Sequence, residues 1–198
     1  MKTTAWAWLT PLILVPGAAD AHLVSTRFGE LYSGLLHPLT ALQHLVPWIA
    51  LALLGGLQDT RTARWALIAF PISVGCGVVT ADLAPGVAYA TSVNAASFVV
   101  LGLLVAIKKR LPLIEFMALA VIIGITHGYA NAATDVQGFG ALLYVSGVTL
   151  AAYLIITLGT ASSHSLAGGP AWGSIAIRAV GSWIAAVGLI YAGFLATT

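Results

Sequence analysis

The stretch LYSGLLHPLTALQHLVPWIALALLGG, at residues 31–56, decides the fold class of this chain. It exceeds the roughly 20 apolar residues that a helix needs to cross the hydrocarbon core of a bilayer. The whole chain of 198 residues has the same character, with 60% hydrophobic and 7% charged residues and a mean hydropathy of +0.99. Soluble domains carry about 25% charged residues. We therefore expect an integral membrane protein that folds as one all-α bundle.

Two histidines lie within this stretch, His37 and His44. An ionisable side chain in a membrane span is costly, by roughly 2.5 kcal/mol or more for a full charge, and usually marks a functional site. Neutral imidazole is also a common ligand of borderline transition metals. Seven residues of continuous helix would place both rings on one side, about 10 Å apart. Pro38 disfavours helical backbone at His37, so the alternatives are an ordinary kink and a break that separates the rings.

Six apolar stretches of near-spanning length make up most of the chain, and their sequences lack the alternation of a membrane β-strand. Lys and Arg occur in the first and third connections but not in the second and fourth, so the positive-inside rule places the odd connections in the cytoplasm. We expect a multi-pass protein of a bacterial inner membrane with a periplasmic N-terminus. The expected spans are residues 31–56, 63–81, 87–107, 112–130, 139–159 and 173–196.

Residues 1–21 have the pattern of a secretory signal peptide, with Lys2, an apolar core and an Ala-Asp-Ala cleavage site. Cleavage would leave a single transmembrane domain at residues 22–198, although the segment could also be retained as an anchor. His22 would then be the first residue of the mature chain, where its amine and ring could chelate copper. The alternative is that His22 merely follows the cleavage site.

A third histidine, His127, lies near the outer end of the fourth expected span. Counting residues from the outer surface puts His37 at a similar depth, so we expect His37 and His127 to face each other and His44 to lie deeper. Asp82 and Asp135, in the outer connections, could gather cations above these rings. The competing interpretations are core hydrogen bonding by the imidazoles and ordinary solvation of the two carboxylates.

Two further charges fall inside expected spans, Glu115 and Arg178. Both lie near the cytoplasmic side, and charges in membrane spans are usually tolerated in pairs. We expect an ion pair between them that supports the scaffold.

At its histidines and along nearly its whole length, the chain resembles the HupE/UreJ family, which is regarded as a family of nickel or cobalt permeases associated with hydrogenase and urease. The resemblance implies a cleaved signal ending in Ala-His, a first-span pattern H-P-x-x-G-x-D-H-L, a third-span pattern S-v-l-v-l-G-l-l, and a fourth-span pattern H-G-x-A-H-G-x-E. The matching residues are Ala21, His22, His37, Pro38, His44, Leu45, the run Ser97–Leu104, His127, Gly128 and Ala130.

The chain departs from that pattern at its acidic positions. Gln43 stands where the family has aspartate, Thr91 and Thr134 stand where it has glutamate, and Asn131 replaces the second histidine of the fourth-span pattern. Ala41 replaces the first-span glycine. A divalent cation in a low-dielectric site needs compensating negative charge, and these four polar side chains offer only dipoles around the histidines. We therefore expect weaker nickel or cobalt binding, a different ion such as copper, or a lost transport role.

Three functions stay open from the sequence. The first is a permease or metal-binding accessory protein in the lipid bilayer that uses the histidines. The second is a non-transporting subunit that assembles with partner membrane subunits. The third is a redox protein with haem or copper bound by histidine. The sequence shows no nucleophile–base arrangement typical of an enzyme and no nucleic-acid-binding pattern, and its net charge of +2 says little about partners.

Overall fold

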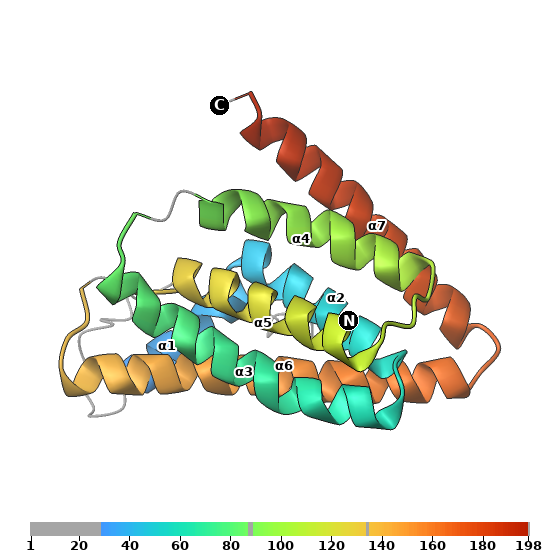
Figure 1. Cartoon of the computed structure of the whole chain (residues 1–198), viewed down its shortest axis with the longest axis horizontal. Coiled ribbons are helices and arrows are strands. Elements are labelled where there is room, and N and C mark those ends of the chain that lie inside the picture. The colour runs from blue at the N-terminus through green and yellow to red at the C-terminus, as the bar shows by residue number, and fades with distance from the viewer. Residues whose placement is uncertain (1–28, 87–88, 134, 198) are drawn as a thin grey trace, which may run out of the picture.

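The computed structural model describes residues 29–86, 89–133 and 135–197, and this part of the chain is entirely helical and without strands (Figure 1). The expected signal peptide and His22 lie outside the described residues. The helices are α1 Gly29–Thr40, α2 Leu42–Gly56, α3 Thr60–Leu83, α4 Tyr89–Ala106, α5 Leu113–Ala130, α6 Phe139–Gly168 and α7 Gly173–Leu195.

Four of these helices, α3, α5, α6 and α7, are long and apolar enough to cross a membrane. The pair α1 and α2 passes the same test only when taken together, which raises the number of candidate spans to five. In helix α4 the apolar stretch whose side chains the structure describes, Thr91–Ala106, is shorter than these four spans. The described part of the chain thus shows four to five candidate spans and does not confirm the six predicted.

The first predicted span, residues 31–56, is broken at Ala41, where α1 and α2 meet at an angle of 77°. Ala41 has extended backbone, with φ −91° and ψ 92°, between two helical residues. Pro38 lies inside α1, so His37 keeps helical backbone and the break comes three residues after the proline. The continuous-helix register between His37 and His44 therefore does not apply. The helix is broken, as one of the two alternatives had it, but at Ala41 and not at His37.

Helix α6 continues to Gly168, nine residues beyond the predicted end of the fifth span. The segment TASSHSLAG contains no proline, and the first strong helix breakers are Gly168, Gly169 and Pro170. Its hydroxyl groups also bind α2, since Thr160 Oγ1 donates to the carbonyl of Ala52 at 3.2 Å and Ser163 Oγ to that of Leu53 at 2.7 Å. Hydrogen bonds of this kind join helices in a membrane.

Glycines bring several helix pairs into backbone contact, among them α3 with α5 and α4 with α7 (Figure 1). A Cβ atom on Gly128 of α5 would collide with the backbone of Val74 in α3. In the α4–α7 pair, a Cβ atom on Gly102 of α4 would collide with the backbone of Ala185 in α7. Small residues allow this close approach, which is typical of helix packing in lipid.

The centre of the bundle is filled by large side chains that are fully buried. Trp48 of α2 meets Phe70 of α3 edge to face, with ring centroids 5.5 Å apart. Phe116 of α5, Leu101 of α4 and Ile156 of α6 are buried in the same core. The core packs α2, α4 and α5 against one another, and His44 and His127 lie on two of these helices.

Candidate metal site

Two of the predicted histidines form a buried pair between α2 and α5. Nδ1 of His44 lies 3.1 Å from Nδ1 of His127, and the ring centroids are 5.2 Å apart in an edge-to-face arrangement. His44 is 3% exposed and His127 is fully buried. A contact of 3.1 Å between ring nitrogens is a hydrogen bond, so one nitrogen carries the proton and the other offers its lone pair.

A serine on α4 fixes which nitrogen of His127 carries the proton. Ser97 Oγ donates its only proton to the carbonyl of Asn94 at 2.6 Å, so it must accept the 3.0 Å bond from Nε2–H of His127. His127 therefore keeps a lone pair on Nδ1, and this lone pair accepts the hydrogen bond that Nδ1–H of His44 donates. The result is a directed chain from His44 through His127 and Ser97 to the backbone of α4.

Two buried asparagines next to these hydrogen bonds have side-chain oxygens that no donor reaches in the described structure. Asn94 Nδ2 donates to the carbonyl of Thr126 at 3.2 Å, and Asn131 Nδ2 donates to that of His127 at 2.7 Å. Tyr144 Oη donates to the backbone carbonyl of Asn131 at 2.9 Å and not to its side chain. Oδ1 of both asparagines is therefore buried and unpartnered within the described structure. Buried polar atoms of this kind usually have a water molecule or an ion as partner.

The spacing of the two imidazole nitrogens suits ligands of a single metal ion. With metal–nitrogen bonds of about 2.0–2.1 Å, two ligands are roughly 2.9 Å apart at a right angle and roughly 3.4 Å apart at the tetrahedral angle. The observed 3.1 Å falls between these values. A metal ion would displace the proton between the rings, and that proton would move to Nε2 of His44. Within the described residues, the two histidines have no third His, Cys, Asp or Glu beside them.

Residues 10–191 match the model of the HupE / UreJ protein family, which covers most of the chain. The chain belongs to the HupE/UreJ family. Comparisons with curated proteins and with solved structures found no match. The family consists of accessory or transport membrane proteins linked to nickel and cobalt and is not a known class of enzymes. Together with its apolar helices, this membership makes the chain a multi-pass membrane protein.

The structure changes which histidines of this HupE/UreJ protein meet. The predicted contact between His37 and His127 is not among those that the described residues make; His127 pairs instead with His44, in the first turn of α2 after the 77° bend at Ala41. His37 is exposed, and its ring contacts that of Tyr144, with centroids 6.3 Å apart. His44, predicted as a separate and deeper ligand, is the partner of His127.

Most of the other predicted site residues lie away from this pair. Asp135 is exposed in the connection between α5 and α6, and Gln43 and Thr91 are exposed on their helices. Asp82 lies in the last turn of α3, and its side chain is outside the described part. Thr134 also lies outside the described residues, so Asn131 is the one predicted supporting residue that the structure places beside the pair.

The expected ion pair between Glu115 and Arg178 is not formed, and both side chains are exposed. Arg178 Nε donates instead to the carbonyl of Ala106, the last residue of α4, at 2.9 Å. The physical reason is the packing order, since α7 lies against α4 whereas α5 lies mainly against α3.

Two residues of the site, Asn94 and Ser97, were not predicted from the sequence as parts of the metal site. Their sequence context, Asn-Ala-Ala-Ser, indicates close helix packing through small residues. The missed signal is their spacing, because positions i and i+3 of an apolar helix share one face and polar residues there need partners.

Proposed function

We propose that this HupE/UreJ protein is a permease that carries a transition-metal ion across the membrane, with the His44–His127 pair as a binding site on the path. Nickel or cobalt is the cargo that the family suggests, and copper is the alternative. The observation that supports this best is the hydrogen bond from His127 Nε2 to Ser97 at 3.0 Å. Ligating histidines are typically oriented by such a partner on the other ring nitrogen.

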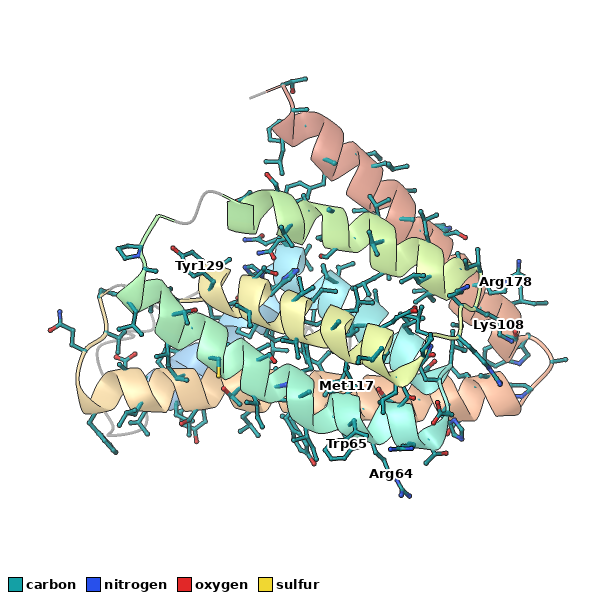
Figure 2. All side chains as sticks on the ribbon, in the orientation of Figure 1. Arg64, Trp65, Lys108, Met117, Tyr129 and Arg178 are labelled. Carbon is teal, nitrogen blue, oxygen red and sulfur yellow. The ribbon has the colours of Figure 1, made fainter. Side chains whose placement is uncertain are left out.

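The distribution of charge supports a direction of transport. Lys2 and Arg27 precede the described residues, and the other six of the eight Lys and Arg lie at one end of the bundle, at the α2–α3 and α4–α5 connections and near the start of α7. Figure 2 shows Arg64, Lys108 and Arg178 towards this end and Tyr129 towards the other. The positive-inside rule makes the basic end cytoplasmic. Glu30 and Asp135, at the opposite end, would then attract cations from the periplasm.

The ligand set favours a weakly held ion. Two neutral imidazoles and the free amide oxygens of Asn94 and Asn131 supply dipoles, whereas a divalent ion in a low-dielectric site is best balanced by carboxylates. Transport needs a site that an ion enters readily and also leaves. A monovalent copper ion would need less negative charge from its ligands than a divalent ion does. Copper is therefore the alternative cargo.

The geometry speaks against haem at this pair. Two axial nitrogens of one haem iron lie about 4 Å apart, with a flat macrocycle between them. The nitrogens of His44 and His127 are 3.1 Å apart and in direct contact, which leaves no space for a porphyrin.

The proposal is tested by uptake of radioactive nickel and cobalt into proteoliposomes, together with elemental analysis of the purified protein. We expect His44→Ala and His127→Ala to lower uptake at least about tenfold, since even the partners of metal ligands contribute that much to affinity. His37→Ala is the matched control, because that imidazole is exposed and is not part of the pair. Uptake and metal content unchanged in both pair variants would refute the site. Stoichiometric co-purification with other membrane proteins would then favour the assembly-subunit alternative.

A further inference from the structure

A second polar site lies at the basic end of the bundle, beyond the end of α2. A cavity of about 230 Å³ opens there between the end of α2, the α4–α5 connection and the end of α6. Its charged and polar lining comes from Gln58, Lys108, Arg110 and His164. A water molecule takes up about 30 Å³ in the liquid, so the cavity has room for a group of several heavy atoms. This site belongs to neither the histidine pair nor its hydrogen-bonded chain.

The α4–α5 connection, which carries Lys108 and Arg110, is held in one conformation by hydrogen bonds from the buried Gln58. Gln58 is 6% exposed, and its Nε2 donates to the carbonyl of Lys109 at 3.0 Å while its Oε1 accepts from the backbone N–H of Leu111 at 2.8 Å. Lys108 has φ +53°, a left-handed conformation that residues other than glycine rarely adopt. Lys108 and Arg110 therefore project from a fixed backbone at the cavity.

These cations are not neutralised by carboxylates. Asp59 follows Gln58 directly, but its oxygens accept from Arg61 N and from both N–H and O–H of Thr62. Lys108 Nζ donates to Ser174 Oγ at 2.8 Å, which leaves its charge uncompensated. In residues 29–86, 89–133 and 135–197 no Lys or Arg forms an ion pair.

A neighbouring, mostly apolar cavity adds one further cation at this end of the bundle. It also measures about 230 Å³, shares Gln58 and His164 with the first cavity, and brings in Arg64 from the start of α3. Thr157 lies on its wall, and Oγ1 of Thr157 is buried without a partner in the described structure. The two cavities share His164, and their cations come from the α4–α5 connection and from the first turns of α3.

We propose that this basic cavity binds a phosphate group. Phosphate oxygens accept charge-assisted hydrogen bonds from Lys and Arg, and unpaired cations held on a rigid backbone are suited to that role. Basic pockets between transmembrane helices on the cytoplasmic side bind anionic lipid headgroups. The headgroup of an anionic phospholipid and free phosphate offer the same chemistry, and the experiment distinguishes these two sources.

The test measures the thermal unfolding of the full chain in a neutral detergent during titration with three probes. Dioctanoylphosphatidylglycerol is the anionic lipid, dioctanoylphosphatidylcholine is the neutral comparison, and inorganic phosphate is the free anion. We expect an anionic probe to raise the unfolding temperature in a saturable way. Lys108→Gln and Arg110→Gln should each weaken this response about fivefold in probe concentration, as expected for one cation near an anionic lipid surface. Lys109→Gln is the matched control, because Lys109 carries the same charge in the same connection but does not line either cavity.

Saturation by phosphatidylglycerol alone assigns the site to a lipid headgroup, and saturation by inorganic phosphate assigns it to free phosphate. An equal loss in Lys109→Gln would show diffuse surface attraction and overturn the site. A response unchanged in Lys108→Gln and Arg110→Gln, or the lack of any response to the three probes, would also overturn it.

Discussion

Ser97 accepts a hydrogen bond from Nε2–H of His127 at 3.0 Å, and this bond leaves the Nδ1 lone pair of the ring facing His44. The serine lies on α4, whereas the two histidines lie on α5 and α2. Three helices therefore determine the state of one imidazole. A metal ion that replaces the proton between the rings finds His127 already in the tautomer that it needs.

The first prediction concerns the loss of the hydrogen bond between Ser97 and His127. Ser97→Ala leaves Nε2–H of His127 buried without an acceptor and frees the ring to change its tautomer. We expect the affinity for nickel or cobalt to fall about 10–100-fold, the usual effect of losing a partner of a ligating histidine. Isothermal titration of the detergent-purified protein measures this change.

A hydroxyl elsewhere in the bundle provides the control for this variant. Ser146 Oγ donates to the carbonyl of Leu142 in its own helix, α6, and is exposed. Ser146→Ala should bind metal as the wild type does. Equal affinity of Ser97→Ala and wild type would show that the serine bond does not prepare the site.

The sequence predicted the helical class because its apolar stretches are long and its connections are short and polar. The limits of α3, α5 and α7 were predicted to within about three residues, since prolines, glycines or charges border them. The break was not placed at Ala41, because Pro38 favours a kink or a break near His37 and only tertiary packing decides where the helix ends. The pairing of His44 with His127 depends on that break, so it was beyond local sequence reasoning.

The second prediction concerns the contact that positions His127. Gly128 of α5 touches the backbone of Val74 in α3, so a methyl group at residue 128 has no space. We expect Gly128→Ala to destabilise the protein by roughly 1–3 kcal/mol, the typical cost of overpacking, and to weaken metal binding by displacing the adjacent His127. Thermal unfolding and metal titration on the same preparation measure the two effects.

A glycine with open space around it provides the comparison. Nothing lies within 4 Å of a Cβ atom built on Gly193 in α7. Gly193→Ala should leave metal binding unchanged and stabilise the helix slightly, because alanine favours a helix interior by up to about 1 kcal/mol over glycine. A similar loss of stability in both variants would mean that the α3–α5 contact has no special role.

The third prediction concerns Asp59, which caps the N-terminus of α3 at the basic end. The side-chain hydrogen bond from Thr62, with backbone bonds from Thr62 and Arg61, holds the pKa of the Asp59 carboxyl below its usual value. A carboxyl whose pKa is lower in the folded state stabilises the fold above its unfolded pKa. That stability is lost as the pH falls from about 4 through the folded pKa.

Asp59→Asn tests this charge dependence, because asparagine also caps helices but does not ionise. The difference in unfolding temperature between wild type and Asp59→Asn should be largest at neutral pH and should disappear as the carboxyl is protonated below about pH 4. Asp59→Ala removes the cap itself and should lower the unfolding temperature at every pH. A difference between wild type and Asp59→Asn that does not change with pH would contradict the assignment.

The last prediction adds a histidine at residue 131, where the pattern implied by the family resemblance has one. Asn131 is fully buried, one helical turn after His127, and Oδ1 of its side chain has no partner within the described residues. Asn131→His would place a third imidazole next to the pair and supply a stronger donor than an amide oxygen. We expect nickel to bind about tenfold more tightly, or about 1.4 kcal/mol, as measured by competition with a chelator.

Asn131→Ala separates the two possible roles of the native amide. Weaker binding in Asn131→Ala and tighter binding in Asn131→His would place the ion between residues 131 and 127. Unchanged affinity in both variants would confine it to the two rings of His44 and His127, where the lack of a third strong ligand would account for a weakly held cargo.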